Sequence, residues 1–101
     1  MLSMLPSVVV IASWKNATTR RFAEQGKGRF PGLDAEKAKA RLQLLDAVRS
    51  MNEIPSLASV GLHKLKGDRK NQWAMRINGP WRLVFEFKDG DAHNVEIVDY
   101  H

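Results

Sequence analysis

Apolar and polar side chains alternate through the last third of the chain, at the period expected of half-buried β-strands. The apolar residues take every second position over 73–77 and again over 81–87. Asn78-Gly79-Pro80 and Asp89-Gly90 are strong turn sequences, and residues 95–98 have the composition of another strand. The pattern predicts an antiparallel meander of three strands.

Two segments in the first half have the spacing of amphipathic helices. Asn16 is placed to cap a short helix over 17–25, which Gly26 would end. Asp34 is placed to cap a longer helix that reaches about residue 51. The apolar positions of this second helix recur at helical spacing and are Ala38, Leu42, Leu45 and Val48.

The segments around these helices are predicted from composition. Residues 8–14 are β-branched and aromatic and predict a first strand, whereas 52–61 predict a loop. Two helices followed by antiparallel strands give an α+β domain, with one face of the sheet covered by the helices and the other open to solvent.

The size of the chain restricts where a functional site can lie. Its 101 residues support one domain, and 44% of them are hydrophobic, which is ordinary for a folded protein. A domain of this size buries only about 60% of its unfolded surface, so its core is thin. We therefore expect a functional site on a shallow face rather than in a buried cavity.

The charge distribution favours a polyanionic partner. The net charge is +5 and the isoelectric point is about 9.9. Residues 64–82 combine six basic side chains with one acid, and residues 15–29 are also basic, whereas 83–101 are mainly acidic. Solvated surface is the plainer interpretation, since Lys and Arg are exposed in most proteins, but the clustering favours nucleic acid.

Two absences bear on the cellular compartment. The chain has no cysteine, which removes disulfides and thiolate chemistry and fits a reducing compartment. No Lys or Arg precedes Lys15, so the apolar N-terminal stretch lacks the basic region of a secretory signal and is too short to span a bilayer. The expectation is a cytoplasmic protein without membrane contact.

Three groups of residues carry candidate chemistry: the basic loop 62–70, Trp81-Arg82, and the terminal Val98-Asp99-Tyr100-His101. Cleavage of RNA requires a base for the 2′-hydroxyl, a proton for the departing 5′-oxygen and cations for the phosphate oxygens. Histidine, tyrosine and carboxylate side chains can move protons, and arginine and lysine can bind phosphate. The last third of the chain contains all of these groups.

Each group also has a structural interpretation. The terminal residues could close a sheet edge, and His63 could be an ordinary surface or edge-strand histidine. The alternating aromatics are expected in the core rather than on a base-stacking surface. Asp68 and Arg69 could form a local ion pair of little energetic value. No third ligand is spaced suitably with His63 and His101, so no metal site is predicted.

Five separated motifs stand out in the C-terminal part of the chain. They are Leu62-His63-Lys64-Leu65-Lys66-Gly67-Asp68-Arg69, Trp73, Asn78-Gly79-Pro80-Trp81-Arg82-Leu83-Val84-Phe85, Asp89-Gly90-Asp91-Ala92 and Asp99-Tyr100-His101. Together they resemble the HigB toxins of the RelE/ParE superfamily, also called plasmid maintenance killer proteins. The resemblance covers about residues 10–101 and is densest over 61–101.

The resemblance implies a RelE-like, microbial-ribonuclease-type α+β fold, with two N-terminal helices packed on a curved antiparallel sheet. The implied activity is ribosome-dependent cleavage of mRNA in the A site, which inhibits translation and needs no metal or cofactor. The implied partners are mRNA, the ribosomal A site and a cognate helix-turn-helix antitoxin of the HigA-like kind. Operator DNA would be contacted only through the toxin–antitoxin complex.

The resemblance also assigns roles to particular residues. The catalytic set is His63, Asp99, Tyr100 and His101, in which the two histidines handle protons with help from the other two. The phosphate-binding set is Lys66, Arg69 and Arg82. Which histidine is the acid and which the base stays open.

The chain departs from the family pattern in a few places. Lys64 stands where proline is common and His93 where an aromatic residue is usual. Family members tend to begin near position 10, so residues 1–9 are expected to be an N-terminal extension, with 10–101 as the single toxin domain. Mass spectrometry of the native protein would test whether translation starts at Val10.

Two other functions stay open from the sequence. ParE-like toxins share the architecture and inhibit DNA gyrase, although they typically lack the paired histidines and the terminal Asp-Tyr-His. A non-enzymatic nucleic-acid-binding module would use the basic loop to bind phosphates, with strongly salt-dependent affinity and no effect on RNA integrity.

Overall fold

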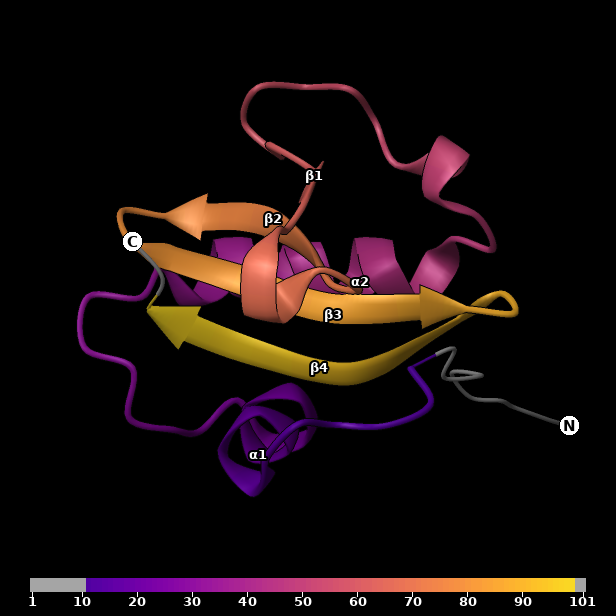
Figure 1. The fold of residues 1–101 in the computed structure, drawn as a ribbon. Coiled ribbons are helices and arrows are strands. Elements are labelled where there is room, and N and C mark those ends of the chain that lie inside the picture. Colours follow the sequence, from indigo (N-terminus) through magenta and orange to yellow (C-terminus); the bar gives the residue numbers. More distant parts are fainter. Residues whose placement is uncertain (1–10, 100–101) are drawn as a thin grey trace, which may run out of the picture.

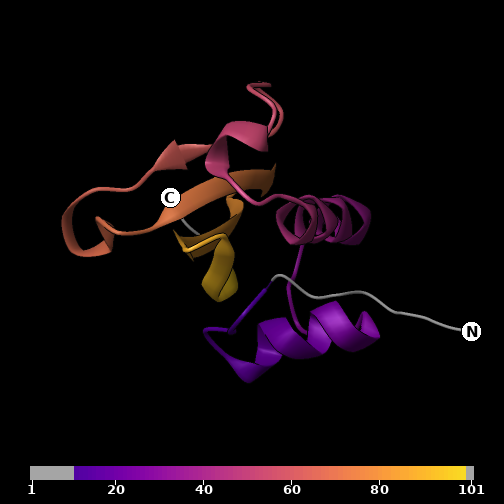
Figure 2. The same cartoon turned by 90° about the vertical axis from the view of Figure 1, so that its right-hand side faces the viewer.

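A computed structural model describes residues 11–99 of the chain. The order of elements along the chain is α1 (Ala17–Gln25), α2 (Ala35–Ala47), the 3₁₀ turn η1 (Met51–Glu53), β1 (His63–Lys64), the 3₁₀ turn η2 (Gly67–Arg69), β2 (Trp73–Asn78), β3 (Trp81–Lys88) and β4 (Asp91–Asp99). The strands form one antiparallel sheet in the order β1-β2-β3-β4. Both helices lie on one side of this curved sheet, so the predicted α+β architecture is confirmed (Figures 1 and 2).

The helix α1 has the predicted bounds because both of its ends are capped by the expected residues. Asn16 Oδ1 accepts a hydrogen bond from the Thr19 amide at 2.9 Å. Gly26 adopts the left-handed conformation, φ 72°, and its amide donates to the Phe22 carbonyl at 2.8 Å.

The second helix begins as predicted but ends earlier. Asp34 Oδ1 accepts from the Lys37 amide at 3.1 Å, and the helix stops at Ala47 rather than near residue 51. Beyond it, the Arg49 amide donates to Glu53 Oε1 at 2.8 Å. This local side-chain bond offers the backbone an alternative to further helix. Val48 stays buried in extended conformation, so its apolar spacing misled the sequence prediction.

The sheet extends beyond the predicted meander. β2 and β3 match their predicted positions, whereas β4 begins at Asp91 and contains a bulge at which Asn94 takes φ 51°. The short edge strand β1 pairs with β2 and was not predicted, because two residues show no period.

The predicted strand at 8–14 is wrong over its described part. Ile11 and Trp14 make only isolated parallel bridges, to Ala92 and Val95 of β4. The Asn94 bulge lies between these two contacts and interrupts a regular ladder. Residues 8–10 lie outside the described residues, as does all of the predicted N-terminal extension.

The main core fills the space between the helices and the sheet. Leu45, Met75, Leu83 and Phe85 are each fully buried there. Trp81 closes one end of the core, where its indole Nε1 donates to the Pro31 carbonyl at 3.0 Å. The predicted alternation is therefore confirmed for β3, with the aromatic residues directed to the helices.

The opposite face of the sheet is only partly open. Leu65 and Val84 are buried there beside Ala74, with Val98 packed against them as a second, smaller apolar cluster. The loop over 65–72 covers this cluster on the side away from the helices (Figure 2). The prediction of a face open to solvent holds only for part of it, because Leu65 folds the loop back onto the strands.

Candidate active site on the open face of the sheet

The register between neighbouring strands arranges the candidate residues in rows across the open face. Directly opposite residues of antiparallel strands project to the same face, so each row can be identified from the pairing. One row crosses all four strands and consists of His63, Ala74, Val84 and Glu96. The adjacent row consists of Arg76, Arg82 and Val98.

Two arginines face each other in that second row. Arg76 of β2 is exposed and is directly opposite Arg82 of β3, which is half-buried. Like charges at directly opposite positions destabilise a sheet unless an anion lies between or above them. The pair therefore provides a shallow site that favours an anionic group such as phosphate.

The Arg82 guanidinium is held in a defined position. Its Nη1 donates to the Gly79 carbonyl at 2.6 Å and to the Trp81 carbonyl at 2.9 Å. Both acceptors lie at the β2–β3 turn, so the guanidinium is oriented by backbone atoms. The other guanidinium nitrogen atoms make no hydrogen bond to residues 11–99, which leaves donors for a ligand.

Arg76 is fixed through its backbone rather than its side chain. The Arg76 amide donates to the Val60 carbonyl at 2.7 Å, and its carbonyl accepts from Arg41 Nε at 2.8 Å. Arg41 also donates through Nη2 to the Ser59 carbonyl at 2.8 Å. These contacts join α2, the 57–61 loop and β2, and they support the part of the sheet from which Arg76 projects.

His63 lies at the β1 edge of the open face and has an oriented ring. Its Nδ1 is 3.1 Å from the Gly61 carbonyl oxygen. A carbonyl can only accept, so this contact places a proton on Nδ1 and directs Nε2 away from it. The side chain is exposed, which gives Nε2 access to a substrate.

The two candidate phosphate ligands in the basic loop have different environments. Lys66 is exposed directly before η2, so its ammonium group is accessible. Arg69 instead donates through Nη1 to Glu96 Oε1 at 3.0 Å and to Gln72 Oε1 at 2.9 Å. Its side chain is 34% exposed, and that of Glu96 is 11% exposed. Arg69 therefore already has an acidic partner, whereas the Arg76 guanidinium forms no ion pair within residues 11–99.

Asp99 ends β4 on the other side of the arginine pair. It is exposed and is paired in register with Trp81, so its side chain projects to the face opposite that of Arg82. The predicted catalytic residues Tyr100 and His101 follow it along the chain but lie outside the described residues.

The strand order separates the two ends of the candidate site. His63 is on β1 and Asp99 is on β4, with the arginines on the two strands between them. Three steps of about 4.8 Å between neighbouring strands separate them by about 14 Å across the sheet, and Asp99, opposite Trp81, is also displaced along the strands from the row of His63. The structure thus places His63 on one side of the arginine pair and Asp99 on the other, and it does not bring them into contact.

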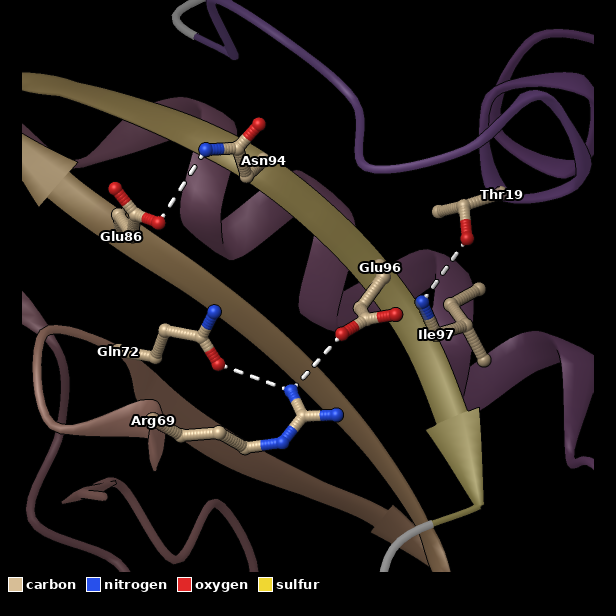
Figure 3. Close-up of polar contacts among 7 residues, drawn as sticks. All are labelled: Thr19, Arg69, Gln72, Glu86, Asn94, Glu96 and Ile97. Atoms are coloured by element: carbon tan, nitrogen blue, oxygen red, sulfur yellow. Dashed lines mark hydrogen bonds and ion pairs between the residues drawn. The ribbon is translucent and has the colours of Figure 1, made fainter. Parts of the chain in front are cut away.

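His93 also lies on the open face, away from the arginines. It is paired in register with Glu86, in the half of β4 before the Asn94 bulge. Asn94 Nδ2 donates to Glu86 Oε2 at 3.3 Å in the same region (Figure 3). The acidic surroundings of this end make it unsuitable for binding phosphate.

Arg76 is the residue of the site that sequence reasoning missed. It was visible as one member of a basic run, but its position opposite Arg82 was not. Asn78 pairs with Trp81, whereas Arg76 pairs with Arg82, so the register shifts by one residue between them. Counting back from the turn without this shift would place a different residue opposite Arg82.

Within residues 11–99, no group of three His, Cys, Asp or Glu side chains is arranged to hold a metal ion. Neither α1 nor α2, the helices in this part of the chain, is long and apolar enough to cross a membrane.

Comparison with known proteins identifies the family. The model of the RelE-like toxin of the type II toxin–antitoxin system HigB matches residues 12–101. The chain belongs to this family. The HigB-like assignment is supported by a curated relative, Endoribonuclease HigB of Proteus vulgaris, at 32% identity over 93 residues, which cover 91% of this chain and 100% of that protein. As a type II toxin, the protein has an antitoxin as its partner.

A solved structure confirms the fold of this HigB-like toxin. The crystal structure of a YafQ mutant from E. coli superimposes with a TM-score of 0.54 at 18% sequence identity. The superposition covers 83% of this chain and 87% of the YafQ chain. At this level of identity the likeness supports the RelE-like architecture and not the position of individual catalytic groups.

Proposed function

We propose that this toxin is an endoribonuclease that cleaves mRNA in the ribosomal A site and thereby inhibits translation. The observation that carries the proposal is the arginine pair Arg76–Arg82, which lies between His63 and the end of β4. The name of the Proteus vulgaris relative, Endoribonuclease HigB, supports the same activity.

The chemistry follows from this arrangement. The 2′-oxygen of a nucleotide attacks the adjacent phosphorus, a 2′,3′-cyclic phosphate forms, and the bond from phosphorus to the 5′-oxygen breaks. The attacking and departing oxygens lie on opposite sides of the phosphorus, so one proton must be removed on one side and one added on the other. His63 acts on one side of the phosphate, and the C-terminal residues Asp99, Tyr100 and His101 act on the other.

The arginines stabilise the phosphate while this proton exchange takes place. Negative charge grows on the non-bridging oxygens in the transition state, and fixed cations lower its energy most effectively. Arg82 is fixed by the two carbonyls of the turn, and Arg76 projects from the opposing strand. Lys66 adds a further positive charge from the loop.

The ribosome has a physical role in this proposal. The site is a shallow face rather than a cleft, so it provides few contacts that would hold a flexible RNA strand in the geometry needed for attack. Bound in the A site, the codon is already ordered, which lowers the entropic cost of reaching that geometry. The antitoxin is proposed to be a helix-turn-helix protein of the HigA-like kind, through which operator DNA is contacted.

A purified translation system tests the proposal. Message integrity is compared with and without ribosomes, for the wild-type protein and for a variant lacking His101. Cleavage by the wild type only on translated message is the expected result, and cleavage of free message would refute ribosome dependence. Intact message throughout would favour ParE-like inhibition of DNA gyrase or simple nucleic-acid binding, which a supercoiling assay separates.

A further inference from the structure

Glu96 is the one buried charged residue among residues 11–99, with 8% of its surface exposed. It lies on β4 in the row that begins at His63, on the face that we propose to bind RNA. Burial of a carboxylate is costly unless a cation and hydrogen bonds compensate it. A buried acid on a phosphate-binding face therefore requires an explanation.

Its cation comes from the basic loop. Arg69 extends from η2 across β3 and donates to Glu96 Oε1 at 3.0 Å (Figure 3). The same Nη1 donates to Gln72 Oε1 at 2.9 Å, so two residues of the 65–72 loop contribute to the contact. The ion pair connects the loop to the far strand of the sheet, 27 residues along the chain.

Backbone hydrogen bonds within the loop connect Arg69 with Lys66. The Leu65 amide donates to the Gln72 carbonyl at 2.8 Å, which closes the loop at its base. The Arg69 amide donates to the Lys66 carbonyl at 3.3 Å. The position of Arg69 therefore helps to set the backbone from which the Lys66 side chain extends.

We propose that Arg69 and Glu96 are positioning residues, whose ion pair holds the 65–72 loop on the sheet and so sets the position of Lys66. This inference rests on the proposed function, and it gives Arg69 a different role from the phosphate ligand that the family resemblance implies. If Arg69 turned to a phosphate, it would leave the buried Glu96 carboxylate without this cation and close to a second anion. Both consequences oppose such a movement.

The test compares four variants with the wild type, at a temperature at which circular dichroism shows all of them folded. They are Arg69→Ala, Glu96→Ala, the double variant Arg69→Met with Glu96→Leu, and the control Lys70→Ala. Lys70 is an exposed cation of the same loop and takes no part in the ion pair, so its removal changes the loop's charge and not its attachment. Two readouts are taken: the maximal rate of message cleavage on ribosomes, and amide hydrogen exchange at Leu65.

The proposal predicts a particular pattern. Arg69→Ala and Glu96→Ala each lower the maximal cleavage rate by ~10–10²-fold, because misplacement of a catalytic group by about 1 Å has effects of this size. Leu65 exchange accelerates in both. The Met–Leu variant restores slow exchange and most of the rate, since a well-packed apolar pair can replace a buried ion pair. Lys70→Ala retains the wild-type rate.

Other patterns overturn the proposal. If Arg69 binds phosphate, both variants that lack it lose activity equally, while Glu96→Ala cleaves normally. If the ion pair serves stability alone, unfolding temperatures fall but the maximal rates of the folded variants stay at the wild-type level. If the wild type does not cleave message, the proposed function fails, while Leu65 exchange still reports whether the pair holds the loop. Unchanged exchange in Arg69→Ala and Glu96→Ala would refute the attachment itself.

Discussion

The two faces of β2 and β3 differ in what their side chains do. Towards the helices, Met75, Leu83 and Phe85 are fully buried in one apolar core. Towards the other side, Arg76 and Arg82 lie directly opposite each other, although like charges at such positions destabilise a sheet. Strand period alone dictates this alternation, so one short segment of sequence supplies both the stability of the fold and the charge of the site.

A small domain can carry a charge pair that destabilises its fold if the pair lies on a solvent-exposed face. A protein of this size has only about 5–15 kcal/mol of net stability, so unfavourable charge must remain where water and a ligand can compensate it. A shallow face meets this condition, whereas a buried cavity does not. Glu96 is the exception, and its ion pair with Arg69 compensates its burial.

Replacing the aromatic residue at the centre of the core should have the largest effect. Phe85→Ala is expected to lower the free energy of unfolding by about 3–5 kcal/mol, because it removes buried surface and leaves a cavity. Urea denaturation monitored by tryptophan fluorescence measures this change. Cleavage per folded molecule should stay at the wild-type level. A lower cleavage rate in folded Phe85→Ala protein would show that the core face contributes to activity as well as to stability.

On the open face, removal of the oriented arginine Arg82 should lower the cleavage rate and leave the stability of the fold nearly unchanged. Arg82→Ala is expected to lower the cleavage rate by ~10²–10³-fold, the usual effect of deleting a fixed donor to a developing oxyanion. Its unfolding midpoint should change little. The matched control is Arg21→Ala, an exposed arginine of α1 on the far side of the sheet. Equal activity of the two variants would remove Arg82 from the proposed site.

A smaller effect is expected at the contact between α1 and β4. The Thr19 hydroxyl accepts from the Ile97 amide at 3.1 Å and is fully buried (Figure 3). Thr19→Val should cost about 1–3 kcal/mol in unfolding free energy, since the buried amide loses its acceptor. Thr19→Ser keeps the hydroxyl and should cost less. The reverse order in thermal denaturation would mean that the methyl group, not the hydrogen bond, stabilises this contact.

The smallest of these effects concerns the start of α1. Asn16→Ala removes the acceptor for the Thr19 amide and should destabilise the protein by about 1 kcal/mol. Chemical denaturation gives the value, with Asn16→Asp as the variant that keeps a capping oxygen. Because α1 lies on the helix-covered side, the cleavage rate should be unaffected. A lower rate in Asn16→Ala would show that the helix-covered side also contributes to catalysis.

Local chemistry made much of the fold predictable. Asn16, Gly26 and Asp34 specify helix ends through hydrogen bonds within a few residues, and the alternation along β2 and β3 follows from burial on one side. The end of α2 was missed because Val48 continues the apolar spacing after the backbone has left the helix. β1 was missed because its pairing depends on β2 and not on its own sequence.

The candidate site was predictable in its members but not in its arrangement. His63, Lys66, Arg82 and Asp99 were identified as chemical groups, and the structure places His63 and Arg82 on the open face, Lys66 in the loop above it and Asp99 opposite Trp81 at the end of β4. The position of Arg76 depends on a register shift, which no local pattern reveals. The partnership of Arg69 with Glu96 depends on how the loop folds over the sheet, so it also required the three-dimensional arrangement.

In the proposed function, RNA cleavage takes place at the His63 end of the open face. The most direct test is the single-turnover rate of message cleavage on ribosomes for His63→Ala and for His93→Ala, a histidine on the same face but in the acidic region near Glu86. The expected result is a loss of ~10²–10⁴-fold for His63→Ala, as for removal of a general acid or base, and a wild-type rate for His93→Ala. A wild-type rate for His63→Ala, or an equal loss in both variants, would contradict it.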